Sequence, residues 1–177
     1  MPITGERLSE WIRETSRLSV SFTSSFEARF GYPPGENAVV ALPTRDVEAV
    51  AQALKAAGVR GDLLDLYRQV EVVSLPDVGI GLFVHAAGNV IEGMTAGVHP
   101  TRIIGSVSDE VTVFGSDGGG ALFALSASQD KVYKLHGGSL VGSIYQVDDS
   151  NAEIVARGLW EFLEYLRGEL SQAVSPD

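Results

Sequence analysis

Short apolar runs separated by turn-forming residues occupy the chain between residues 111 and 147 and limit the possible folds more than any other feature. The runs are Val111–Phe114, Ala121–Leu125, Val132–Leu135 and Leu140–Val147. Connections rich in glycine, serine and aspartate join them, and the longest is Gly115–Gly120. A parallel crossover needs about a dozen residues or more, so connections this short predict an antiparallel meander.

The first forty residues are predicted to begin with a helix and to continue irregularly. Thr4 can cap the helix, and Leu8 and Trp11 then share its apolar face. Residues 19–38 are rich in serine, glycine and proline, which indicates an irregular connection. Its aromatic side chains between Phe22 and Tyr32 are expected to anchor it to the core. The alternative is that they form an exposed contact patch.

Two further helices and two strands are predicted before the meander. Apolar residues recur at helical spacing over residues 44–57 and 62–70, and Gly58 can end the first of these helices. Residues 72–75 and 79–85 have the composition of strands. The segment 86–97 is ambiguous, and one interpretation is a helical turn.

A long amphipathic helix is predicted to close the chain. Ser150 and Glu153 match a capping box, which places the start of this helix at Ser150. Its core face is formed by residues three and four apart: Val155, Leu159, Phe162, Leu163, Leu166 and Leu170.

Together these elements predict an α+β fold. It has N-terminal helices, a central, mainly antiparallel β-sheet (a meander) and a C-terminal amphipathic helix packed on the sheet. We expect residues 1–40 to form the helix and irregular extension, and residues 41–177 to form the α+β domain.

The charge of the chain is strongly negative and unevenly distributed. The formal net charge is −10, of which residues 1–70 carry −1 and residues 71–177 carry −9. Phosphate contacts need clustered Lys and Arg, so nucleic-acid binding is not expected. The acidity can simply keep the protein in solution, or it can steer a basic partner toward one face.

The absence of cysteine and of long apolar runs limits the cellular compartment and the metal chemistry that we expect. The chain has no cysteine, so it can form neither a disulfide nor a thiolate metal site. The first twenty residues carry Glu and Arg where a signal peptide needs an apolar run, and no stretch approaches a membrane span. We therefore expect a cytoplasmic protein that does not bind membranes.

No motif in the chain predicts catalysis, a metal or a cofactor. The loop Gly115–Gly120 lacks the Lys-Ser/Thr of a phosphate-binding loop and precedes a strand, so we interpret it as a glycine-rich β-turn. The three histidines stand at no metal-ligand spacing. The carboxylate pairs Asp109-Glu110 and Asp148-Asp149 are sequence neighbours, which point to opposite faces of a strand rather than toward one substrate.

The stretch from Leu63 to Leu166 resembles the SMI1/KNR4 (SUKH) superfamily. The segments that carry the resemblance are Leu63–Tyr67, Val73–Gly81, Phe83–His85, Val113–Leu125, Val132–Leu135 and Leu159–Leu166. The resemblance is strongest at Val113–Leu125, and Asp117 to Gly120 is its most specific part. The family's N-terminal helix is matched only loosely by Ala41–Pro43, and the first forty residues have no counterpart.

The resemblance implies a non-enzymatic protein-binding domain. Bacterial members look like immunity proteins that bind and neutralise toxins, often nucleases, and fungal members look like signalling scaffolds. On this basis the candidate partner-binding or motif residues are Asp117, Gly118, Gly119, Gly120, Asp148, Asp149 and Glu153.

Three functions are left open by the sequence, and the oligomeric state is not predicted. The first is a bacterial immunity protein whose partner is a basic toxin, possible because nuclease toxins carry basic surfaces. The second is an adaptor or scaffold for an internal protein partner, with the aromatic segment as a contact. The third is an enzyme or small-molecule binder that uses the cleft between the N-terminal helices and the sheet.

Overall fold

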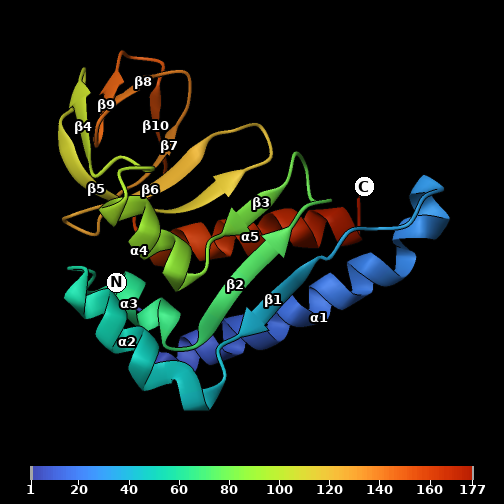
Figure 1. The fold of residues 1–177 in the computed structure, drawn as a ribbon. Helices are drawn as coiled ribbons and strands as arrows, with labels where there is room; N and C mark the ends of the chain where they lie inside the picture. The colour runs from blue at the N-terminus through green and yellow to red at the C-terminus, as the bar shows by residue number, and fades with distance from the viewer. Residues whose placement is uncertain (1, 177) are drawn as a thin grey trace.

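The computed structural model describes residues 2–176, which form a mixed ten-stranded sheet with helices packed against it (Figure 1). The helices are α1 (Gly5–Phe30), the 3-10 turn η1 (Thr44–Asp46), α2 (Val47–Ala56), α3 (Asp62–Tyr67), α4 (Ala87–Thr95) and α5 (Leu159–Val174). The strands are β1 (Ala38–Ala41), β2 (Val70–Leu75), β3 (Leu82–Val84), β4 (Arg102–Gly105), β5 (Asp109–Asp117), β6 (Leu122–Ser126), β7 (Val132–Leu135), β8 (Ser139–Val141), β9 (Ile144–Val147) and β10 (Ala152–Ala156). This arrangement confirms the predicted α+β class.

Strand β5 lies where the sheet branches. The main strand order is β1-β2-β3-β5-β4-β9-β8, and β6, β7 and β10 continue from β5 on a second path. All pairs are antiparallel except β4 with β9, which are parallel. The meander prediction missed this pair because the two strands are far apart in the sequence, so no short connection indicates their contact.

Two hydrophobic clusters share the strands of this branch. The larger cluster joins the five α-helices to β2 and β3, and it also contains Phe114, Phe123, Leu125 and Val132 of β5, β6 and β7. The smaller one lies within residues 101–156, which we call the β lobe, at the upper left of Figure 1. It contains Ile103, Val111, Val113, Ala124, Tyr133, Leu135, Tyr145 and Val147.

Helix α1 is longer than predicted, because residues 19–30 are helical rather than irregular. The predicted cap is present, with the Thr4 hydroxyl accepting the N–H of Arg7 at 3.4 Å, but the helix ends only at Gly31, whose φ is +79°. Serine hydroxyls in this stretch donate to carbonyls of the preceding turn, as Ser24 does to Val20 at 2.7 Å. Their polarity is therefore satisfied within the helix.

Helices α1 and α5 run side by side in the same direction. The buried Trp11 indole donates to the Leu163 carbonyl at 2.9 Å, and the Arg29 guanidinium donates to the Ala173 carbonyl at 2.7 Å. Between these contacts, Arg167 pairs with Glu14. Helix α1 is thus packed into the same core as the C-terminal helix.

The capping box predicted at Ser150 is wrong. The hydroxyl and N–H of Ser150 both donate to Asp148 in a turn, and the following residues form β10, paired with β7. Helix α5 begins only at Leu159, after Gly158 at φ +106°. Val155 consequently belongs to a strand. The other five residues of the predicted core face are buried on α5, as expected.

Replacing Trp11 tests whether α1 is part of the core. Trp11→Ala removes a fully buried side chain together with its indole bond to the Leu163 carbonyl, so we expect the free energy of unfolding to fall by about 3–5 kcal/mol. Val20→Ala on the same helix is the control, because Val20 is 66 % exposed and should change stability by less than about 0.5 kcal/mol. Equal effects in denaturant titrations would contradict the packing described.

Candidate functional site

The motif residue Asp117 forms the base of the turn that joins β5 to β6. Its carboxylate is buried, accepts the backbone N–H groups of Gly119 and Ala121 at 2.9 Å each, and pairs with the Lys134 ammonium at 3.2 Å. Burial alone would raise the pKa of Asp117, but the Ala121 N–H, the Lys134 ammonium and the Gly119 N–H together hold it below its usual value. Asp117 is therefore ionised and fixed in place.

Gly118 lies directly against the β2–β3 connection. Its N–H donates to the Gly81 carbonyl at 3.1 Å, and a Cβ at this position would overlap the carbonyl oxygen of Ile80. Gly120 has φ +90°, which favours glycine. The structure thus confirms the predicted glycine-rich β-turn, in which Gly118 allows a close backbone approach and Gly120 a positive φ.

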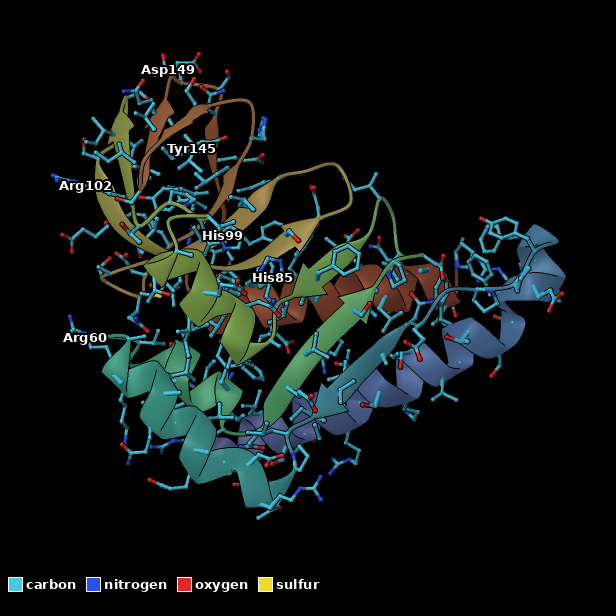
Figure 2. The ribbon with its side chains drawn as sticks, in the orientation of Figure 1. Arg60, His85, His99, Arg102, Tyr145 and Asp149 are labelled. Carbon is cyan, nitrogen blue, oxygen red and sulfur yellow. The ribbon has the colours of Figure 1, made fainter. Side chains whose placement is uncertain are left out.

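The other three predicted site residues lie at the β9–β10 turn and on β10. The Asp148 carboxylate accepts the hydroxyl and N–H of Ser150, which lowers its pKa, and Asp149 lies exposed at the tip of the β lobe (Figure 2). Glu153 is exposed on β10, opposite Lys134 on β7. Lys134, whose ammonium pairs with Asp117, is thus the cross-strand neighbour of Glu153, whereas Asp148 and Asp149 belong to the turn before the strand.

Carboxylates from three elements surround Tyr165 on α5. Glu161 and Glu169 lie one helical turn before and after Tyr165 on the same stripe of the helix. The pKa of Tyr165 is raised first by burial and then by the negative charges of Glu169, Asp117 and Glu153. Carboxylates of α5, β5 and β10 thus act electrostatically on one phenol. We call Asp117, Glu153, Glu161, Glu169 and Tyr165 the acidic face.

The acidic face combines negative charge with an accessible aromatic ring. Its four carboxylates and the neighbouring Lys134 ammonium leave a formal charge of −3. Tyr165 is 39 % exposed, and its ring packs at 6.0 Å from that of Phe162, which is buried in the core. An arginine or lysine of a partner can therefore meet the carboxylates of Glu153, Glu161 and Glu169 beside an exposed aromatic ring.

Sequence reasoning found only part of this face. Glu161 and Glu169 contribute to the charge of −9 that the sequence places in residues 71–177, but no sequence pattern was used to predict a role for Tyr165. The spacing of four residues between Glu161, Tyr165 and Glu169 is a signal that was available in the sequence. The contribution of Asp117 and Glu153 was not, because it depends on how β5 and β10 are placed beside α5.

The structure pairs two of the histidines, which sequence spacing did not indicate. The rings of His85 and His99 stack beside α4 with centroids 5.7 Å apart, and His85 Nε2 lies 2.8 Å from the Ser116 hydroxyl (Figure 2). Within residues 2–176 the Nδ1 atom of each ring is buried without a hydrogen-bond partner. Burial lowers the pKa of both histidines, and the positive charge of His99 lowers that of His85 further.

This His85–Ser116 pair lacks the third group of a catalytic triad. In such a triad a carboxylate orients the histidine through Nδ1, and no described residue bonds His85 there. Among residues 2–176, no three His, Cys, Asp or Glu side chains are grouped to hold a metal ion.

The aromatic segment after residue 20 is divided between core and surface. Phe22 and Phe26 are buried, in agreement with the predicted anchoring, whereas Phe30 and Tyr32 are 48 % and 56 % exposed. The rings of Phe30 and Tyr32 both contact Phe26, with centroids 4.6 Å and 5.2 Å away. The contact-patch alternative therefore stays open for Phe30 and Tyr32.

Comparisons with known proteins identified no relative of this chain. No family model, no curated protein and no solved structure matched the chain. Within the described residues, none of the helices combines the length and the apolar character needed to cross a lipid bilayer.

Replacing Gly118 tests the structural role of the motif. A Cβ in Gly118→Ala must displace the Ile80 carbonyl, so we expect a loss of about 1–3 kcal/mol in the free energy of unfolding. Gly88→Ala in α4 is the control, since a Cβ there meets open space and should leave stability unchanged or raise it by about 0.5–1 kcal/mol. A neutral Gly118→Ala variant would show that the turn tolerates a side chain.

The histidine pair predicts a loss of stability in mild acid. Both folded-state pKa values lie below the unfolded value of about 6.5, so the unfolded chain binds more protons and the free energy of unfolding falls as pH drops below about 6.5. Urea titrations between about pH 8 and about pH 5.5 should show this fall, and His85→Gln/His99→Gln should flatten it. His136→Gln, at an exposed position, should retain it. A double variant with the original pH dependence would contradict the assignment.

Proposed function

We propose that the chain is a non-enzymatic, SMI1/KNR4-type protein-binding domain that acts as a bacterial immunity protein. It binds a basic toxin through the acidic face and so neutralises it. The observation that carries this proposal is the convergence of carboxylates from α5, β5 and β10 on the half-exposed Tyr165. The resemblance to the SMI1/KNR4 superfamily supplies the class of partner.

Charge complementarity supports a basic partner. A toxin that cleaves nucleic acid must carry Lys and Arg to hold phosphates, and a negative face attracts such a surface at long range. Steering of this kind raises association rates by about ten- to a thousandfold and weakens as salt screens the charges. The tyrosine adds a side chain of the type that most often dominates binding energy at interfaces.

The rigidity of the acidic face also supports a binding role. Asp117 is held by two backbone N–H groups and Lys134, and Tyr165 rests on the ring of Phe162. Side chains that are already ordered lose little conformational entropy when a partner docks. More of the interaction energy then remains as affinity.

The exposed ends of Phe30 and Tyr32 favour a second candidate function. An adaptor or scaffold of the same type would bind an internal partner at this pair, which lies at the C-terminal end of α1 away from the β lobe (Figure 1). Such a partner would contact apolar rings rather than carboxylates, and its binding would depend weakly on salt.

Growth rescue and binding kinetics test the proposal, with candidate toxins taken from the genes that neighbour the gene of this chain. Co-expression should restore growth of cells that make the toxin. The variant Glu153→Lys/Glu161→Lys/Glu169→Lys should slow association of the purified proteins by about tenfold or more, because it reverses the steering charge. Tyr165→Ala should act instead on dissociation and weaken the complex by about tenfold or more.

The matched control is Glu27→Lys/Glu36→Lys/Glu71→Lys, which changes the net charge equally at exposed positions outside the acidic face. Equal slowing by both triple variants would show that only total charge matters and would overturn the assigned face. Absence of rescue and of a complex would overturn the immunity function. Loss of toxin binding in Phe30→Ser/Tyr32→Ser alone would place the interface at this pair of rings and would also overturn the assigned face.

A further inference from the structure

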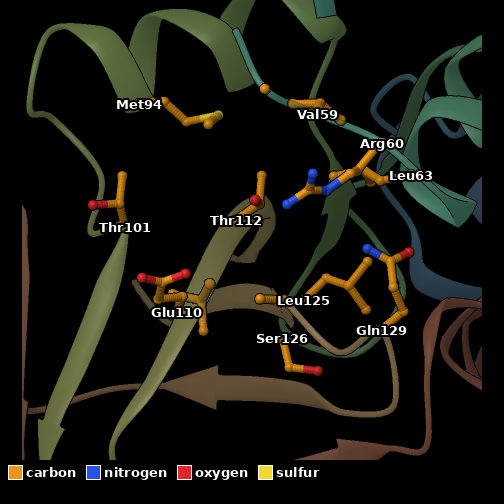
Figure 3. Close-up of a pocket in the computed structure, with 13 residues that line it drawn as sticks. Val59, Arg60, Leu63, Met94, Thr101, Glu110, Thr112, Leu125, Ser126 and Gln129 are labelled. Carbon is orange, nitrogen blue, oxygen red and sulfur yellow. The ribbon is translucent and has the colours of Figure 1, made fainter. Parts of the chain in front are cut away.

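A cavity of about 270 Å3 opens between the helices and the β lobe. The α2–α3 connection, α3 and α4 form one wall, and β5, β6 and the β6–β7 turn form the other (Figure 3). Its size lies near the lower end of the range for small-ligand pockets, about 300–1,000 Å3. It lies in the cleft between the N-terminal helices and the sheet, apart from the acidic face.

Part of the cavity lining is apolar. Met94 of α4 lies half-buried on the helical wall, and Leu125 from β6, which is 2 % exposed, lies across the cavity from it (Figure 3). A flexible thioether fits a small aliphatic group of variable shape. This part of the lining therefore favours a ligand with an apolar side chain.

The rim of the cavity carries one charge of each sign. The Arg60 guanidinium points into the cavity from the helical wall, and Glu110 lies on the opposite wall beside Thr101 (Figure 3). Among the described residues no carboxylate lies within 4.0 Å of Arg60, and Glu110 makes no ion pair. Both groups are thus available to a ligand.

Gln129, which lines the same cavity, carries a polar side chain on a strained backbone. Gln129 has φ +67° and is the only non-glycine with positive φ among residues 2–176. Its side-chain oxygen accepts the Asp62 N–H at 2.9 Å, which leaves the amide nitrogen on the cavity side (Figure 3). A strained residue that positions a donor beside an open cavity is typical of binding sites.

We propose that this cavity binds a zwitterionic α-amino acid with an apolar side chain. The ligand carboxylate pairs with Arg60, the ligand ammonium pairs with Glu110, and the side chain rests on Leu125 and Met94. A simple anion would be repelled by Glu110, and a simple cation by Arg60. A wholly polar ligand would leave the Met94 thioether uncovered. This binding is independent of the proposed toxin-binding function, which uses a different surface.

Calorimetric titration of the full chain with L-leucine and three analogues tests the proposal. N-acetyl-L-leucine lacks the ammonium, L-leucinamide lacks the carboxylate, and glycine lacks the apolar side chain. We expect L-leucine to bind and each analogue to bind at least about tenfold more weakly, because each loses one of the three contacts.

Substitutions of residues at the rim of the cavity test the same proposal from the protein side. Arg60→Met should weaken L-leucine binding by about tenfold or more, since it removes a charge-assisted hydrogen bond. Arg68→Met, an exposed arginine that does not line the cavity, is the control and should leave affinity unchanged. Arg60 is itself exposed, so its replacement should leave the thermal unfolding temperature unchanged.

Several outcomes would overturn the proposal. One is no heat of binding for leucine, methionine or phenylalanine up to about 10 mM. Another is equal binding of L-leucine and its N-acetyl derivative, which would mean that Glu110 plays no part. A third is unchanged affinity in Arg60→Met.

Discussion

Strand β5 is hydrogen-bonded to β3, β4 and β6, and the rest of the structure depends on this branching. Its first residues pair with β4, whereas its last residues pair with β3, which is followed by β2 and β1 in the sheet. The register shifts between Val113 and Gly115, and a Cβ at Gly115 would stand only 2.5 Å from the Phe83 carbonyl oxygen. A glycine at this bulge allows β3 and β6 to approach one strand from both sides.

The two surfaces with proposed functions lie at opposite ends of β5. At its C-terminal end, Asp117 closes the turn to β6 and contributes to the acidic face around Tyr165. Toward its N-terminal end, Glu110 and Thr112 line the cavity that faces Arg60. A protein partner and a small ligand would therefore contact separate regions of one rigid strand, and each proposal can fail without the other.

Local sequence signals predicted those elements whose stability is largely local. The meander strands alternate with short glycine-rich turns, and α5 carries its apolar residues at helical spacing, so both were found. The signals failed where tertiary contacts outweighed them. Ser150–Glu153 has the composition of a capping box, yet pairing with β7 makes residues 152–156 a strand. Residues 19–30 have the composition of a loop, yet packing of Phe22 and Phe26 keeps them helical.

The sequence by itself determined the α+β class, the antiparallel hairpins, the glycine turn at residues 118–120 and the location of the negative charge after residue 70. These follow from periodicity, turn chemistry and counting, which act over a few residues. Only the tertiary structure decided the parallel β4–β9 pair, the stacking of His85 on His99, the acidic face and the cavity below Arg60. Each of these brings together residues from elements distant in the chain, and spacing along a chain holds no information about which elements meet.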